Sequence, residues 1–69
     1  MNATQTRVFD HIKANPGATH HTIAYRIDPY VPFNTLRRVT QELRSAGLVE
    51  ARTLTGQIDK VAFYATVAQ

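Results

Sequence analysis

Four polar side chains in the middle of the chain have the hydrogen-bonding groups that fit the edges of base pairs: Asn34, Arg37, Arg38 and Gln41. An arginine guanidinium can donate two hydrogen bonds to guanine, and an Asn or Gln amide can pair with adenine. In a helix, residues at these spacings lie on the same side. We therefore expect a helix that presents arginines and amides to a partner.

The helix that would carry these side chains is predicted at about residues 33–46. Its opposite side has an apolar stripe at helical spacing, made of Leu36, Val39, Leu43 and Ala46. Pro32 suits the first turn of a helix, where its missing N–H costs nothing. Gly47 suits the left-handed residue that follows a helix, and Leu48 suits the hydrophobic contact of such a cap. These signals predict one face packed on a core and one exposed face.

Two shorter helices are predicted before it, at about residues 4–14 and 20–27. The Asn-Pro-Gly sequence at 15–17 ends the first, and Thr19 is a good N-cap for the second. Two prolines fix an ordered connection to the third helix. The apolar residues expected to pack in this part of the chain are Val8, Phe9, Ile12, Ile23, Ala24, Ile27, Tyr30 and Val31.

After the third helix, the hydrophobic period changes from helical to alternating, which predicts β-strands. A two-stranded antiparallel hairpin is expected at about residues 48–67, with its turn at Thr55-Gly56-Gln57. The phenylalanines are all expected in the core: Phe9, Phe33 and Phe63. The prediction is an α+β fold, with three helices and a C-terminal hairpin in a single domain over residues 1–69.

The composition fits a small folded protein with an anionic partner. The 69 residues are 43% hydrophobic, which is near the lower limit for a self-sufficient core. Eight Lys and Arg against five Asp and Glu give a net charge of +3, and six of the cations are arginine. No cysteine is present, which excludes disulfides and cysteine-based zinc sites. The sequence shows neither a membrane span nor a secretory segment, so we expect a soluble, cytoplasmic protein.

No catalytic or metal-binding pattern occurs in the sequence, so we expect neither an enzyme nor a cofactor. The chain has no Gly-rich phosphate loop, nucleophile elbow or cysteine nucleophile, and Ser45 is the only serine. His11, His20 and His21 lack an HExxH pattern, and adjacent residues on a helix point about 100° apart. We expect these histidines to be exposed.

The stretch from Thr35 to Val49, Thr-Leu-Arg-Arg-Val-Thr-Gln-Glu-Leu-Arg-Ser-Ala-Gly-Leu-Val, resembles the third helix and wing start of winged helix-turn-helix DNA-binding proteins. The Thr–aliphatic start, the leucine four residues before glycine and the Gly-Leu-Val ending carry the resemblance. Residues Thr19 to Ala24 are similar to the start of the family's second helix. The chain departs from the family in two ways: Thr40 replaces an apolar residue, and the connection before the third helix is about two residues longer.

The resemblance implies a small transcriptional regulator of bacterial or phage type that binds double-stranded DNA. Its third helix would enter the major groove, with base readout by Asn34, Arg37, Arg38 and Gln41. Its hairpin, the wing, would lie near the backbone. The residues predicted to contact the DNA backbone are Thr19, His20, His21, Tyr30, Arg44, Arg52 and Lys60.

Other interpretations of the same residues stay open. The polar face of the third helix could be solvated only, and Arg38 could pair with Glu42 four residues on. The fold could also serve as a protein-binding adaptor or inhibitor on the transcription machinery, or as an architectural or excision-type factor that bends DNA. A homodimer could form through the first helix or through an edge strand at residues 61–67, and a monomer or cooperative binding on DNA also stays open.

Overall fold

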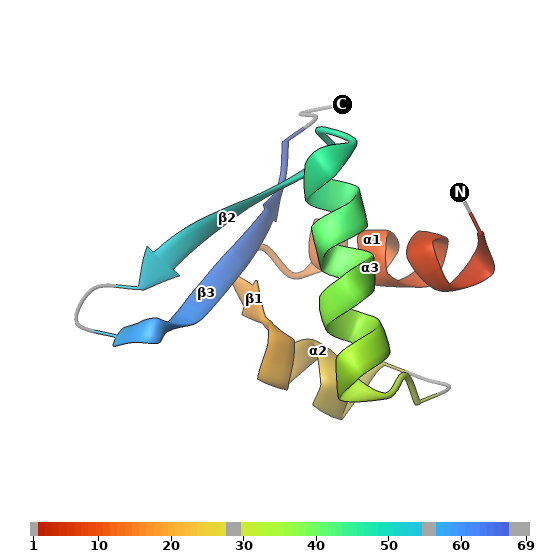
Figure 1. Cartoon of the computed structure of the whole chain (residues 1–69), viewed down its shortest axis with the longest axis horizontal. Coiled ribbons are helices and arrows are strands. Elements are labelled where there is room, and N and C mark those ends of the chain that lie inside the picture. The colour runs from red at the N-terminus through yellow and green to blue at the C-terminus, as the bar shows by residue number, and fades with distance from the viewer. Residues whose placement is uncertain (1, 28–29, 55–56, 67–69) are drawn as a thin grey trace.

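The computed structural model describes residues 2–27, 30–54 and 57–66, without the side chains of residues 54 and 57–60. Three helices are followed by a hairpin that extends away from them (Figure 1). The predicted α+β fold is therefore confirmed, and one short strand is added to it. The elements are α1 (Ala3–Ala14), β1 (Ala18–Thr19), α2 (His20–Arg26), α3 (Phe33–Ser45), β2 (Val49–Leu54) and β3 (Gln57–Ala65).

The first helix, α1, is closed at its start by a reciprocal cap. The Asn2 side chain accepts a hydrogen bond from the Gln5 N–H at 2.8 Å, and the Gln5 side chain accepts from the Asn2 N–H at 2.9 Å. This capping box satisfies backbone donors that the helix itself leaves unpaired. The helix ends at the predicted Asn-Pro-Gly turn, where Gly17 has a φ of +89°.

The second helix, α2, begins at the predicted N-cap. The Thr19 hydroxyl accepts a hydrogen bond from the Thr22 N–H at 3.2 Å, which is the ordinary role of threonine at this position. Ile23 is fully buried, and Ala24 and Ile27 pack against the core from its edge. The prediction of an ordered Pro29 connection lies outside the described residues.

The third helix, α3, has one unexpected end and one predicted end. Pro32 is its N-cap and not a first-turn residue as predicted, and it makes no side-chain capping bond. At the other end, the Gly47 N–H donates to the Arg44 carbonyl and the Leu48 N–H donates to the Leu43 carbonyl, both at 3.0 Å. With Gly47 at a φ of +77°, this is the predicted left-handed helix cap.

The three strands form an antiparallel sheet in the order β1-β3-β2. Ala51 of β2 and Ala18 of β1 both lie opposite Phe63 of β3. The prediction that residues 61–67 form an edge strand is therefore wrong at Ala62 and Phe63, where β1 pairs with β3. Strand β1 has only two residues, too few for an alternating pattern to reveal it.

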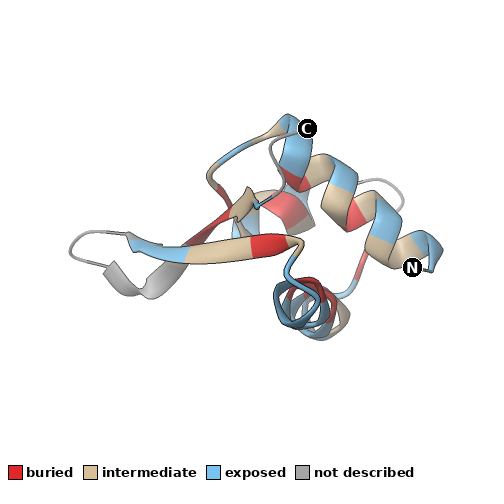
Figure 2. Cartoon of the chain, turned by 90° about the horizontal axis from the view of Figure 1, so that it is seen from above, coloured by how far each residue is buried: buried red, intermediate tan, exposed pale blue. Residues whose placement is uncertain are grey.

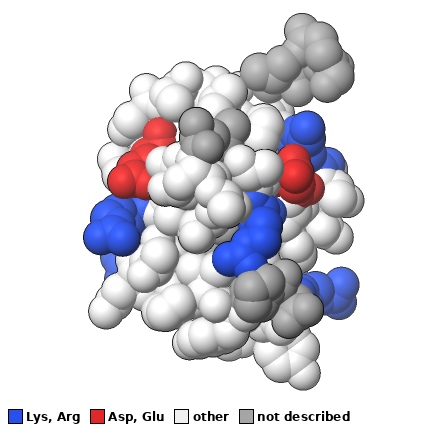
Figure 3. Space-filling model, turned by 90° about the vertical axis from the view of Figure 1, so that its right-hand side faces the viewer, with Lys and Arg blue, Asp and Glu red and all other residues white. Residues whose placement is uncertain are grey.

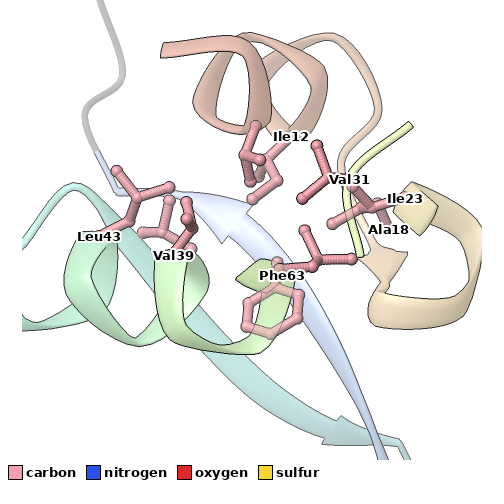
Figure 4. Packing of buried hydrophobic residues seen from close by; sticks show 10 residues of the cluster. Ile12, Ala18, Ile23, Val31, Val39, Leu43 and Phe63 are labelled. Atoms are coloured by element: carbon pink, nitrogen blue, oxygen red, sulfur yellow. The ribbon is translucent and has the colours of Figure 1, made fainter. Parts of the chain in front are cut away.

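The hydrophobic core lies where α1, α2 and α3 meet the sheet (Figure 4). Fully burying an aliphatic or phenylalanine side chain stabilises a protein by about 1.5–3 kcal/mol. Three predictions about this core are wrong, because Phe33 is 43% exposed, Tyr30 is 71% exposed, and Ala46 is also exposed. The buried hydrophobic residues are Val8, Ile12, Ala18, Ile23, Val31, Leu36, Val39, Leu43, Val49, Ala62 and Phe63.

Seen along its axis, α3 lies at one side of the molecule with its exposed face turned outward (Figure 2). Its inner face is buried against the other elements, and the hairpin extends beside it. None of the described helices is long and apolar enough to cross a membrane.

Candidate functional site

The outward face of α3 gathers the side chains that the sequence predicted for base recognition. Leu36, Thr40 and Leu43 are buried on the inner face, so residues about half a turn away point outward. Every predicted reader is exposed, together with two residues nearer the end of the helix. We call this surface the α3 outer face; it consists of Asn34, Arg37, Arg38, Gln41, Arg44 and Ser45.

The two borders of the α3 outer face differ. On one border, Glu42 accepts a hydrogen bond from the Gln5 side chain of α1 at 2.9 Å, so the open pairing of Arg38 with Glu42 is replaced by a contact between helices. On the other border, a groove of about 420 Å³ separates α3 from β2. The groove is lined by Gln41, Arg44, Ser45, Val49, Glu50 and Ala51.

His20 lies beneath the α3 outer face and connects α2 to α3. Its Nε2 atom is 3.0 Å from the Thr40 hydroxyl, which itself donates to the Arg37 carbonyl at 2.9 Å. Because the Thr40 proton is used in that bond, the His20 N–H is the donor and the Thr40 oxygen the acceptor. The expectation that His20 is exposed is wrong, because its ring packs against Phe33 and Phe63. The same expectation is wrong for His11, which is only partly exposed.

This position favours the neutral form of His20. Burial, and then the charges of Arg37 and Arg44, lower the pKa of His20 from its ordinary value of 6.5. The three groups therefore lie close enough to interact electrostatically. The departure at Thr40 noted in the sequence also has a structural role, since this buried hydroxyl replaces an apolar contact with two hydrogen bonds.

The other residues predicted at the DNA backbone lie on α2, on its connection to α3 and on α3 itself. The Thr19 oxygen is occupied as the N-cap of α2, while His21 is exposed. Tyr30 projects from the connection and is largely exposed. Arg44 belongs to the α3 outer face.

Arg52 on the hairpin is held by two neighbours. It forms an ion pair with Glu50 on the same strand, and its guanidinium lies 4.3 Å from the centre of the Tyr64 ring on β3. The contact with the ring is a cation–π interaction. Lys60 lies in β3, but its side chain is outside the described residues, as are Thr55 and Gly56 of the predicted turn; Gln57, the third residue of that predicted turn, is the first residue of β3.

On the side of the molecule nearest the start of α1, charges of both signs are interspersed (Figure 3). Lys13 lies 3.9 Å from Asp10 on α1, and its ammonium is 5.0 Å from the centre of the Phe9 ring. Among the residues that the structure describes, no group of three or more His, Cys, Asp or Glu side chains is arranged to hold a metal ion.

Two solved structures resemble this chain over almost its whole length. The crystal structure of the transcriptional regulator SlyA matches 96% of this chain and 44% of its own, with a TM-score of 0.80 and 21% identity. The crystal structure of MarR matches 96% of this chain and 47% of its own, with a TM-score of 0.79 and 18% identity. The chain has a winged helix-turn-helix fold. No family model matches it, and no curated protein matches it in sequence.

In this fold, α2 and α3 are the helix-turn-helix pair and the β2–β3 hairpin is the wing. The chain spans less than half the length of SlyA and of MarR. The sequence-based prediction was wrong for one residue beside the candidate site: Phe33 was expected in the core but is exposed. Its spacing offered a signal: Phe33 lies four residues before Arg37, and residues at this spacing lie on the same side of a helix.

Proposed function

We propose that this protein binds double-stranded DNA sequence-specifically and acts as a small transcriptional regulator. The α3 outer face carries the proposal, since it presents three arginines and two side-chain amides on one exposed surface of a winged helix-turn-helix fold. Among the described residues, none of these arginines has a carboxylate within ion-pair distance. SlyA, which has the same fold, is a transcriptional regulator, and this supports the same role for the present chain.

Within the α3 outer face, we assign base readout first to Arg37 and Gln41. Arg37 influences His20 and Gln41 lines the groove beside β2, so both belong to the border that α3 shares with α2 and the wing. Asn34 lies in the first turn of α3, where a recognition helix reaches the bases. Arg38 projects closer to the α1 border, about 40° from Glu42 around the helix axis, and we give it the smallest part in readout.

We assign backbone contacts to the residues that surround this border. Arg44, His21 and Tyr30 are exposed on α3, α2 and the connection between them, and Thr19 lies at the start of α2. Arg52 and Lys60 would bring the wing near the phosphates. His20 has a different proposed role, because its hydrogen bond to Thr40 joins the two helices: it would hold α2 and α3 at the angle that the DNA requires.

To test this proposal, a duplex that the protein selects from random-sequence DNA is labelled. The protein is then titrated onto this duplex, and binding is followed by fluorescence anisotropy. A protein that neutralises several phosphates should show a linear fall of log K with log salt, at a slope of about −0.9 for each phosphate. Arg37→Ala should weaken binding to the selected duplex by roughly 5- to 150-fold if the arginine reads a base. A duplex that fails to bind even at low salt, together with stoichiometric capture of a protein, would favour the adaptor interpretation.

The matched control is Arg26→Ala. It removes the same side chain and charge from the last turn of α2, where Arg26 lies near His11 of α1. Equal losses from Arg26→Ala and Arg37→Ala would mean that net charge alone drives binding. Footprints on the selected duplex would also report stoichiometry, because a dimer protects two half-sites about 34–36 Å apart and a monomer protects one.

A further inference from the structure

Phe33 is an exposed aromatic residue at the first position of α3. Its side chain is a wholly apolar aromatic ring, and 43% of the residue is accessible to solvent. Leaving apolar surface in water is unfavourable. Burial of Phe33 against an apolar group of a partner would therefore be favourable, and its place in α3 indicates which partner.

The Phe33 ring is supported from behind. Its centre lies 5.8 Å from the centre of the His20 ring, at a tilt of 40°. His20 in turn packs edge-on against buried Phe63, with ring centres 4.7 Å apart at 72°, and is fixed by its hydrogen bond to Thr40. A side chain held in this way loses little conformational entropy when it binds.

The position of Phe33 directs it to the same partner as its polar neighbours. Arg37 follows four residues later on the same side of α3, and Asn34 is the next residue along the chain. If α3 lies in the major groove, as the proposed function requires, its first turn reaches the base edges. There, the thymine 5-methyl group is the apolar feature that a phenylalanine ring can contact.

We propose that Phe33 is a specificity-determining residue that recognises the methyl group of a thymine. The inference rests on the proposed function and extends it from hydrogen-bonded readout to apolar readout. The chain has other exposed aromatic side chains, but Tyr25 lies in α2 and Tyr30 in the connection before α3. Neither shares a helix face with Arg37.

The experiment replaces thymines in the selected duplex by deoxyuridine, one at a time, which removes only the methyl group. For the unmodified protein, at least one replacement should weaken binding about fourfold, the effect of one lost methyl contact. For Phe33→Ala, the same replacement should change the affinity by less than twofold. Tyr25→Ala, which removes a more exposed aromatic ring, should keep the full fourfold discrimination.

The outcomes separate this inference from the proposed function. If no duplex binds, both are overturned. If the protein binds a selected duplex but no deoxyuridine replacement weakens binding by more than twofold, only the Phe33 inference is overturned. It also fails if Phe33→Ala keeps the discrimination while binding both duplexes equally more weakly, because Phe33 would then act only by supporting α3.

A second variant guards against loss of structure. Phe33→Leu retains an apolar side chain against His20 and should keep part of the preference for thymine. Thermal unfolding of Phe33→Ala, followed by circular dichroism, should show a folded protein, since the residue is not part of the buried core. Sedimentation of both variants should match that of the unmodified protein; conversion of a dimer to a monomer would assign Phe33 to a protein interface instead and overturn the inference.

Discussion

Both α3 and the wing carry arginines, but the described neighbours of those arginines differ. On the wing, Arg52 faces Glu50 and lies over the Tyr64 ring. On α3, Arg37 and Arg44 have no ion-pair partner among the described residues, and after burial their charges are the next cause of the lowered pKa of His20. Both surfaces therefore carry guanidinium groups, but those of Arg37 and Arg44 on α3 are unpaired among the described residues, whereas that of Arg52 on the wing is already engaged.

The difference follows from the geometry of the two elements. On one face of a sheet, cross-strand neighbours lie about 4.5–5.5 Å apart at Cβ, so Glu50, its partner Tyr64 and the next residue Arg52 on that face readily meet. On α3, the one acidic side chain is turned toward α1 by its bond with Gln5. We therefore expect α3 to supply most of the affinity and the wing to supply little.

The largest expected effect is the difference between Arg37→Ala and Arg52→Ala in their affinity for the selected duplex. Each variant removes one arginine. Arg37→Ala should cost about 1–3 kcal/mol if it reads a base, and Arg52→Ala should cost less than about 1 kcal/mol, as for an arginine already engaged at an exposed pair. Anisotropy titrations at one salt concentration measure both. Equal losses would break the contrast between α3 and the wing.

Substitution of Gly47, which lies between α3 and the wing, should give the next largest effect. A residue with a side chain at a φ of +77° costs roughly 1–2 kcal/mol in the left-handed region. No atom would lie within 4 Å of an added Cβ, so the cost of Gly47→Ala is that of the backbone alone. Thermal unfolding should report a melting temperature lower by about 4–8 °C per kcal/mol for a chain of this size.

Asparagine provides the control at this joint, because it tolerates the left-handed conformation better than alanine. Gly47→Asn should recover part of the stability lost in Gly47→Ala. Because the substitution lowers the stability of the folded protein and adds no steric contact, DNA binding by Gly47→Ala should be normal at temperatures where the variant is fully folded. A binding defect in the folded variant would show that α3 and the wing must be held at a fixed angle.

The features that the sequence revealed are those with a strong local signal. The apolar stripe at Leu36, Val39 and Leu43, the Thr19 cap and the Gly47 cap each depend on a few neighbouring residues and have their predicted roles, although Ala46 of the predicted stripe is exposed. The outward position of the predicted readers follows from the same helical period. Their roles in binding DNA stay predictions.

The features that the sequence concealed depend on contacts between distant residues. The two residues of β1 are strand only because β3 pairs with them. His20 reaches Thr40 across 20 positions, and Gln5 reaches Glu42 across 37. Phe33 was assigned to the core by its residue type, whereas the turn of the helix leaves it at the border of the inner face. No local pattern contains the contacts of β1, His20 and Gln5, whereas the spacing of Phe33 to Arg37 did offer a signal.

A smaller effect is expected when the wing arginine is released. Glu50→Gln removes the carboxylate that pairs with Arg52, so it should strengthen DNA binding, by up to about 1 kcal/mol, the usual limit for an exposed ion pair. The salt slope should become steeper by about one phosphate contact. Both quantities come from anisotropy titrations over a range of salt concentrations.

Asp10→Asn is the control for that change. It removes the same charge from α1, where Asp10 lies near Lys13 and away from the wing. If Asp10→Asn strengthens binding as much as Glu50→Gln, the gain reflects net charge and not the release of Arg52. If neither changes the salt slope, Arg52 does not approach the phosphates even when it is free.

The smallest expected effect is a change in the titration of His20, which reports directly on the unpaired charges of α3. Arg37 and Arg44 help to lower the pKa of His20, so Arg37→Ala and Arg44→Ala should each raise it toward 6.5. Arg52→Ala should leave it unchanged, because Arg52 is not among the causes of the shift. The imidazole proton signals of His20, followed by NMR as the pH is changed, measure the pKa in each variant.

The same shift makes a prediction for stability, with a definite sign. The folded state releases the His20 proton at a lower pH than the unfolded state, whose histidine titrates near 6.5. The unfolded chain therefore binds more protons in this window, and the free energy of unfolding falls as the pH drops below 6.5 toward the lowered pKa. His11, whose pKa is lowered by burial and by Arg26, acts in the same direction.

The experiment compares two variants, His20→Gln and His21→Gln, by urea unfolding at several pH values. The free energy of unfolding should depend less on pH in His20→Gln than in His21→Gln, which removes the exposed neighbouring imidazole. Equal dependence in the two variants would mean that neither burial nor the charges of Arg37 and Arg44 lower the pKa of His20 in the folded protein.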